Sequence, residues 1–267
     1  MGRLLDLLLP PACAACGLPG PVACAGCLRS LEPLEPPLCE GCGAPVPVPV
    51  GRCPGCRGRV ARARQAVAYS AAAPALVAAL KDGRRRALAT VLAERIAQAV
   101  PAPPLGAALV PVPLGPRRLA ARGFNQSLLI ARELARRWGR PVAESLARVR
   151  EEPAQRGASA TTRARQAAGA FAPAGADPVP AHAVLVDDVH TTGATLADCA
   201  RALRAGGART VGAACFARVI KRMPASCGPA CAPRAPGRGP RQTGAPASPG
   251  RAPEKALDEV GDPSPPF

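Results

Sequence analysis

Two adjacent carboxylates and a loop of small hydroxylated residues follow one another in VLVDDVHTTGAT, residues 184–195. The apolar start predicts a buried strand that delivers Asp187 and Asp188 to the edge of a sheet. The loop would then place backbone N–H groups and hydroxyls around a concavity at the start of a helix, which suits a phosphate monoester. The carboxylates beside it suit the hydroxyls of a ribose. The loop residues are Thr191, Thr192, Gly193, Ala194 and Thr195.

Other interpretations of this stretch compete. Nucleotide triphosphatases also have an apolar strand that ends in acids, but they require G-x-x-x-x-G-K-[ST], and no lysine of this chain follows a glycine. A receiver-type acidic pocket would not require the hydroxylated loop, and acids that only cap the next helix would bind no ligand; both alternatives stay open. For a phosphate loop, we expect Gly193→Val to remove binding and to leave the fold largely intact.

Eight of the twelve cysteines form four C-x-x-C pairs within the first 60 residues. Each pair can present two thiolates to one metal, and two pairs complete a tetrahedral site, so the four pairs predict two structural zinc ions with no open position for a catalytic water. We expect successive pairs to share a zinc ion, although the intervening loops also permit interleaved pairing. A disulfide scaffold is the alternative, and the absence of a secretory signal argues against it. The predicted ligands are Cys13, Cys16, Cys24, Cys27, Cys39, Cys42, Cys53 and Cys56.

Beyond residue 60 the chain alternates between strand and helix patterns. This alternation predicts an α/β fold with a mostly parallel sheet covered on both faces, in which ligands bind at the carboxyl ends of the strands. We therefore expect a cysteine-rich module at 1–60, an α/β domain at 61–222 and a disordered tail rich in Pro, Gly and Ala at 223–267. Strands are expected at 64–70, 107–113, 141–149, 183–189 and 210–218, and helices at 74–100 with a break near Gly83, at 125–139 and at 194–208.

The composition favours anionic partners but does not identify one. The chain has 267 residues and a net charge of +17, and residues 61–222 carry 25 basic and 10 acidic side chains. Such an excess attracts phosphate or nucleic acid, although a GC-rich codon bias would also enrich arginine. Only 2% of the residues are aromatic, which argues against base stacking on single strands. We find neither a targeting signal nor a stretch long enough to span a membrane, and we expect a cytoplasmic protein.

Three blocks of the sequence, in this order, resemble the ComF family. They are the ladder of C-x-x-C pairs, VPVPLGPRRLAARGFNQS at 110–127, and VLVDDVHTTGAT, which is similar to the phosphoribosyl pyrophosphate signature of type I phosphoribosyltransferases. The resemblance covers residues 1–218. It implies an N-terminal double zinc ribbon, a type I phosphoribosyltransferase domain and a role in bacterial competence and DNA uptake.

The resemblance also implies roles for individual residues. Asp187 and Asp188 would act as the catalytic pair that holds the ribose hydroxyls, and residues 191–195 would hold the 5′-phosphate. The arginines of the second block would lie near the pyrophosphate, whose charge guanidinium groups accept well; they are Arg117, Arg118 and Arg122. We assign no role to His182 or His190.

The implied reaction is displacement at the anomeric carbon of phosphoribosyl pyrophosphate, with Mg²⁺ bridging the diphosphate and ribose oxygens. Its acceptor is not implied. In residues 148–171 the chain departs from the family, which usually has Thr, Leu and Asn at the positions of Glu152, Ala158 and Gln166. This segment corresponds to a loop expected to close over the sugar, so the departure bears on turnover more than on binding.

The alternative function is a non-catalytic factor that binds phosphoribosyl pyrophosphate or DNA in DNA uptake or repair. The partners implied by either function are phosphoribosyl pyrophosphate, DNA and proteins of the competence machinery.

Overall fold

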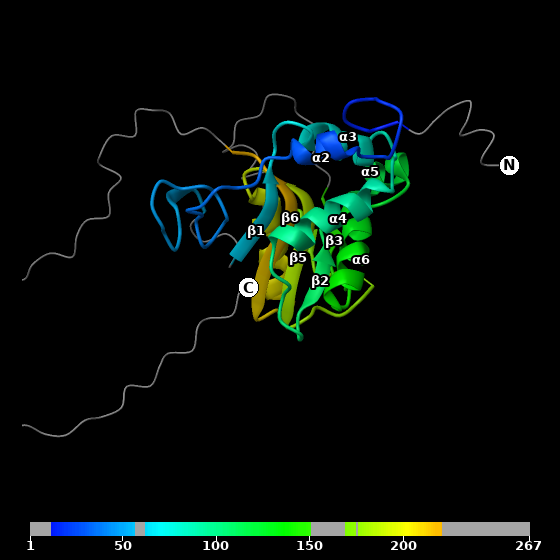
Figure 1. The fold of residues 1–267 in the computed structure, drawn as a ribbon. Helices are drawn as coiled ribbons and strands as arrows, with labels where there is room; N and C mark the ends of the chain where they lie inside the picture. Colours follow the sequence, from blue (N-terminus) through cyan, green and yellow to red (C-terminus); the bar gives the residue numbers. More distant parts are fainter. Residues whose placement is uncertain (1–11, 57–61, 151–168, 175, 221–267) are drawn as a thin grey trace, which may run out of the picture. The chain divides into compact units, whose positions relative to one another are not determined.

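The computed structural model describes residues 12–56, 62–150, 169–174 and 176–220, and Figure 1 shows their arrangement. The chain up to Ile220 groups as one compact unit. The predicted tail at 223–267 and most of the departing segment 148–171 lie outside the described residues.

A four-stranded parallel sheet forms the centre of the fold, with the strand order β1-β6-β5-β2. In the register of β5 with its neighbours, Asp187 lies opposite Cys215 of β6, and Val186 lies opposite Pro111 of β2. The carboxyl end of β5, which carries the two acids, is therefore flanked by the ends of β2 and β6. The strands are β1 (Arg62–Ala68), β2 (Ala108–Pro111), β5 (His182–His190) and β6 (Thr210–Arg218).

Helices cover both faces of this sheet and bury two apolar clusters. On one face α3 (Ala73–Lys81), α4 (Leu88–Ala99) and α6 (Gln126–Trp138) pack over the even-numbered residues of β5, and α4 and α6 lie side by side in Figure 1. On the other face α8 (Ala194–Ala205) packs over the odd-numbered ones. The core consists of Ala, Leu, Val and Ile with few aromatic side chains. The predicted α/β fold class is confirmed, as is the helix break near Gly83.

The predicted strand at 141–149 is wrong for most of its length. Val142 makes one parallel bridge to Leu109 of β2, and beyond it the N–H of Glu144 donates to the carboxylate of Asp177 at 2.7 Å. A strand resumes only at β3 (Ala147–Arg148), which pairs antiparallel with β4 (Phe171–Ala172).

Four short elements were not predicted. They are α2 (Ala25–Arg29), the 3₁₀ turn Pro54–Cys56, α5 (Pro116–Arg122) and the strand β4. α5 has no buried residue, so it lacks the apolar stripe by which an amphipathic helix is recognised. Within the ranges that the structure describes, no helix combines the length and apolar content needed to cross a bilayer.

Candidate functional site

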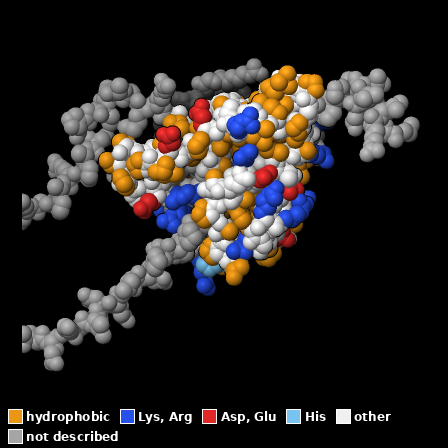
Figure 2. Space-filling view, viewed as in Figure 1, with side chains coloured by type: hydrophobic (Ala, Val, Ile, Leu, Met, Phe, Trp, Pro, Cys, Tyr) orange, Lys and Arg blue, Asp and Glu red, His pale blue; other side chains and the backbone are white. Residues whose placement is uncertain are grey.

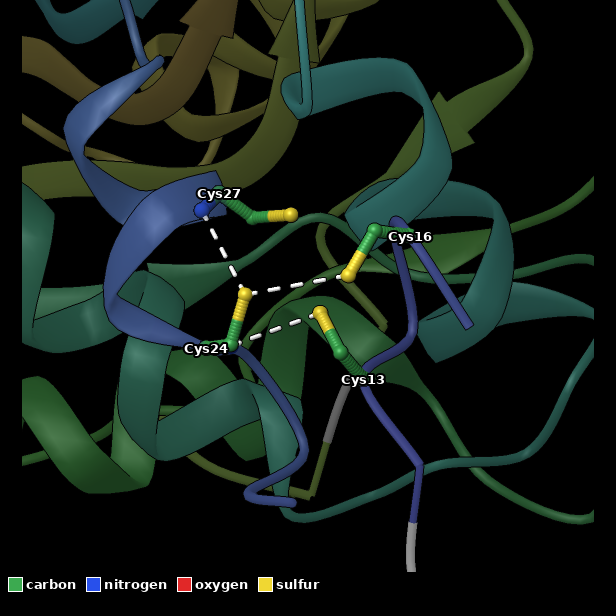
Figure 3. A group of neighbouring side chains, drawn as sticks. All are labelled: Cys13, Cys16, Cys24 and Cys27. Atoms are coloured by element: carbon green, nitrogen blue, oxygen red, sulfur yellow. Dashed lines mark hydrogen bonds between the residues drawn. The ribbon is translucent and has the colours of Figure 1, made fainter. Parts of the chain in front are cut away.

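The eight predicted zinc ligands gather into two groups of four, each made by successive C-x-x-C pairs. The four sulfurs of Cys13, Cys16, Cys24 and Cys27 converge on one point in Figure 3, and within each group all Sγ atoms lie within 4.8 Å of one another. The second group is Cys39, Cys42, Cys53 and Cys56. The expected sequential pairing is therefore the one that the fold assembles.

The sulfur geometry fits zinc. Neighbouring Sγ atoms lie 3.7 Å apart in Cys16–Cys24 and 3.6 Å apart in Cys39–Cys56, close to the ~3.8 Å edge of a tetrahedron with Zn–S bonds of about 2.3 Å. Backbone N–H groups also point at the sulfurs, such as that of Cys53 at 3.1 Å from Cys39 Sγ. Each group therefore has the donors of a closed structural zinc site.

The same N–H groups favour the thiolate form that a metal needs in one cysteine of each group, whereas hydrogen bonds to the neighbouring thiols raise the pKa of Cys27 to about 12. Burial opposes ionisation of the Cys13 thiol, but the backbone donors of Cys16 and Cys24 outweigh it and lower its pKa to about 6. In the second group, burial also opposes ionisation of Cys39, and the backbone donors of Cys42 and Cys53 lower its pKa to about 6.

The two acids at the end of β5 lie on opposite faces of the sheet, because successive side chains of a strand alternate. Val184 and Val186 belong to the cluster under α3, α4 and α6, and Leu185 belongs to the cluster under α8. By this alternation Asp188 lies on the same face as Val184 and Val186, and Asp187 lies on the same face as Leu185. The carboxylates therefore straddle the strand end, and each has its own partners.

Asp188 is 2% exposed and forms an ion pair with Lys81 at the end of α3. Lys81 Nζ donates to Asp188 Oδ1 at 2.6 Å. The other carboxylate oxygen, Oδ2, is buried and has no hydrogen-bond partner among the described residues. A buried carboxylate oxygen normally accepts a hydrogen bond, so this oxygen marks a place where a ligand hydroxyl would be favourable.

Asp187 accepts two hydrogen bonds on Oδ1, from the hydroxyl of Ser127 at 3.0 Å and from the backbone N–H of Asp188 at 2.9 Å. Ser127 lies in the first turn of α6 and is fully buried. Burial of the carboxylate, together with the charge of Asp188, raises the pKa of Asp187 to about 7, although Lys81 and these hydrogen bonds act in the opposite direction. At neutral pH, Asp187 is therefore poised between its two protonation states.

The loop after β5 leads into a helix, as predicted. Gly193 is the N-cap of α8 in the left-handed conformation, with φ +76°, and Ala194 N donates to Thr192 Oγ1 at 3.3 Å. No side chain caps α8, and the acids bond to Lys81 and Ser127 instead. The interpretation of these acids as simple helix caps is therefore wrong.

The structure also corrects the expectation for Gly193→Val. A Cβ at position 193 would lie 2.8 Å from Nε2 of the buried His190, and the backbone there has a φ that other residues rarely adopt. The substitution would therefore strain the fold as well as any binding, and it cannot separate the two.

All three predicted arginines belong to α5, and one of them, Arg122, contacts residues next to the acidic pair. Arg122, at the end of α5, donates to Gln126 Oε1 at 2.6 Å and approaches Asp82 at 3.4 Å. Because Asp82 follows Lys81 directly, this arginine borders the acidic pair. Arg117 and Arg118 are exposed on α5.

Sequence reasoning missed three residues that the fold brings to this place. Lys81 and Ser127 lie 107 and 60 positions from the acids that they contact, so only the tertiary fold reveals them. His190 received no role, but it is buried and bonds to Gln65 and Arg218. His182, by contrast, is exposed and pairs with Thr210.

Comparison with known proteins agrees with this architecture. The phosphoribosyl transferase domain family matches residues 125–226, and the double zinc ribbon domain family matches residues 4–57. The chain joins a double zinc ribbon to a phosphoribosyltransferase domain. The phosphoribosyltransferase match begins at the N-cap of α6 and includes β5, the loop and α8.

Curated relatives carry names that refer to DNA utilization and to competence. The DNA utilization protein YhgH of Salmonella typhi is 39% identical over 153 residues, which are 54% of this chain and 66% of the relative. YhgH of Escherichia coli O6:H1 is 40% identical over 117 residues (42% of this chain, 49% of the relative). Competence protein F of Haemophilus influenzae is 37% identical over 107 residues (39% and 47%). The chain thus spans about half to just under two thirds of these relatives. The names and the two domains are consistent with the ComF family.

Proposed function

We propose that the phosphoribosyltransferase domain binds phosphoribosyl pyrophosphate at the carboxyl end of β5. The observation that carries this proposal is the buried Asp188 Oδ2, which has no hydrogen-bond partner among the described residues and lies beside Lys81, shortly before the loop in which Gly193 begins α8 without a side-chain cap. Carboxylate acceptors for hydroxyls and N–H donors for a phosphate meet here, as a phosphorylated sugar requires.

Each part of the ligand has a counterpart in the site. Residues 191–195 would hold the 5′-phosphate, since Gly193 lets the backbone approach it closely. Asp187 and Asp188 would accept hydrogen bonds from the ribose hydroxyls. Lys81 pairs with Asp188, and Arg122 pairs with the neighbouring Asp82; both cations would face the diphosphate. Mg²⁺, held by ligand oxygens, would neutralise part of the diphosphate charge.

For a transfer reaction, this chain's residues would orient the sugar and stabilise charge rather than attack it. Departure of diphosphate from the anomeric carbon leaves positive charge on the ribose ring, which the neighbouring carboxylates stabilise, while cations stabilise the leaving group. An acceptor nucleophile would then form the new bond to that carbon. The acceptor is not identified by any described residue.

One assay separates a transferase from a non-catalytic binding protein. Zinc-loaded protein is incubated with phosphoribosyl pyrophosphate, Mg²⁺ and a panel of bases and amines, and pyrophosphate release is measured. Acceptor-dependent release that Asp187→Asn abolishes supports transfer. Saturable ligand binding without release for any acceptor supports the non-catalytic function.

A second candidate function, binding of DNA, is favoured by a cluster of six arginines beside the site. The loop between α3 and α4 lies against α5, because Arg84 Nη2 donates to the carbonyl of Ala121 at 2.7 Å and Arg86 stacks over Phe124 at 4.8 Å. We name this surface the arginine cluster; it contains Arg84, Arg85, Arg86, Arg117, Arg118 and Arg122.

Five of these side chains are exposed, which suits the phosphate backbone of a nucleic acid. Figure 2 shows several groups of Lys and Arg side chains on one face of the molecule. The relatives' names, which refer to DNA utilization and competence, support this candidate and partners in the competence machinery.

A further inference from the structure

A line of contacts begins at the second cysteine group and runs into the sheet. Arg218, the last residue of β6, donates from Nη1 to the carbonyl oxygen of Cys42 at 2.8 Å. Its Nη2 lies 3.5 Å from Cys42 Sγ, one of the four sulfurs of that group. The guanidinium therefore contacts both the backbone and the sulfur of a predicted zinc ligand.

The next contact is with His190, the last residue of β5 and the register partner of Arg218. Arg218 Nη1 lies 3.1 Å from His190 Nδ1, and Gln65 Nε2 lies 2.9 Å from the same nitrogen. Arg218 Nη1 also lies 3.5 Å from His190 Nε2, and because a guanidinium only donates hydrogen bonds, the imidazole is the acceptor in this contact, which helps to orient the ring. Both His190 and Gln65 are buried, at 4% and 6% exposure, and water does not replace these contacts readily.

The third contact is between the imidazole and the phosphate loop. The backbone of Gly193 lies so close to the ring that a Cβ at this position would be 2.8 Å from Nε2. Gly193 also begins α8, and its carbonyl accepts from Ala197 N at 2.9 Å. A shift of the His190 ring would therefore move the turn that joins β5 to α8.

We propose that Arg218 and His190 are positioning residues through which the second cysteine group fixes the conformation of the loop at residues 191–194. Zinc in that group would hold Cys42 in place, Cys42 would orient Arg218, and Arg218 would orient the ring that supports Gly193. Groups that contact a metal ligand commonly tune a site in this way. The effect on the loop stands independently, whereas the effect on ligand affinity rests on the proposed function.

The chain offers a matched control in Arg64. This arginine lies on β1 and donates from Nη1 to the carbonyl of Glu40 at 2.8 Å, in the same cysteine-bearing loop as Cys42. No contact that the structure gives for Arg64 involves His190 or residues 191–194. Arg64→Met thus removes one hydrogen bond between β1 and the cysteine-bearing loop. It leaves the contacts of Arg218 with Cys42 and His190 intact.

The first arm of the experiment measures amide hydrogen exchange in zinc-loaded protein, with zinc content determined for every variant. Arg218→Met should speed exchange in residues 191–197 about tenfold, the effect of losing charged hydrogen bonds, while α4 exchanges as in the wild type and two zinc ions remain bound. Arg64→Met should match the wild type, and adding His190→Ala to Arg218→Met should change the loop less than twofold further. Equal exchange of the loop in Arg218→Met and the wild type would overturn the proposal.

The second arm measures affinity for phosphoribosyl pyrophosphate with Mg²⁺ by calorimetry. Arg218→Met should weaken binding about tenfold, and Arg64→Met should leave it unchanged; equal affinity in both variants overturns the proposal. If the wild type itself does not bind, the proposed function fails, and the exchange arm alone decides. Should Arg218→Met lose zinc or fold poorly, Arg218→Lys replaces it. One ammonium cannot reproduce both contacts of the guanidinium, so wild-type loop exchange in that folded variant also overturns the proposal.

Discussion

Asp187→Asn should stabilise the unliganded protein above neutral pH. The folded-state pKa of Asp187 is raised from 3.8 to about 7, first by burial and then by the charge of Asp188. The folded protein therefore binds the proton of the Asp187 carboxyl more tightly than the unfolded chain does. The contribution of this proton to the free energy of unfolding is fully present only below about pH 4. It is lost as the pH rises through about 7. An asparagine mimics the protonated carboxyl and can still accept from Ser127.

The size of the effect follows from the pKa shift. A shift of roughly three units, at about 1.4 kcal/mol for each, gives an upper limit of about 4 kcal/mol at pH 8. Asp187 as a whole residue is half-buried, so water screens part of the charge and about 2 kcal/mol is the expected gain in the free energy of unfolding. At pH 5 the gain should be less than half of its value at pH 8, because the folded wild type is then protonated.

Urea denaturation of zinc-loaded wild type and variant at pH 5 and pH 8 measures this difference. Asp198→Asn is the control, because its buried carboxylate accepts from three backbone N–H groups, those of Gly169, Ala170 and Phe171. That substitution should destabilise the protein at both pH values. If Asp187→Asn instead destabilises the protein equally at pH 5 and pH 8, the assignment of a strained, functional carboxylate is refuted.

The other expected outcomes concern the metal, the ion pair and DNA. Metal analysis should find two zinc ions per chain, and their absence under reducing conditions would contradict the cysteine assignment. Lys81→Met should lower the free energy of unfolding at pH 7.5 by about 3 kcal/mol, since it leaves Asp188 buried without its cation. In a protein that already carries Asp188→Asn, Lys81→Met should cost much less, because no buried carboxylate is left without its cation. An equal cost of Lys81→Met with and without Asp188→Asn would count against the Lys81–Asp188 ion pair. DNA affinity should fall steeply with salt and weaken when Arg84, Arg85 and Arg118 become Gln; binding indifferent to salt would exclude a backbone-charge mechanism.

Local sequence patterns predicted the elements that local physics determines. Apolar runs gave β2, β5 and β6, and helical spacing gave α4, α6 and α8. The pairing of cysteines was expected because successive C-x-x-C turns are close along the chain. α5 was missed, since a helix with no buried residue has no apolar stripe.

The partners of the site residues depend on long-range packing, and the sequence could not supply them. Lys81 reaches Asp188 only because α3 packs beside the end of β5, and Arg218 meets His190 only because β5 and β6 are neighbours in the sheet. The segment predicted as a strand at 141–149 bonds to β2 only through Pro141 and Ala143, and the N–H of Glu144 donates to Asp177, 33 residues away. A contact at that separation along the chain is invisible to pattern analysis.

The measurement that tests the central claim most directly is calorimetry of phosphoribosyl pyrophosphate with Mg²⁺ and zinc-loaded protein. We predict saturable binding at one site per chain. Asp188→Asn should weaken it at least about tenfold through loss of a charged acceptor, while Glu94→Gln, an exposed substitution on α4, should not change it. Absence of saturable heat in the folded wild type, or equal affinity in folded Asp188→Asn, would contradict the proposed site.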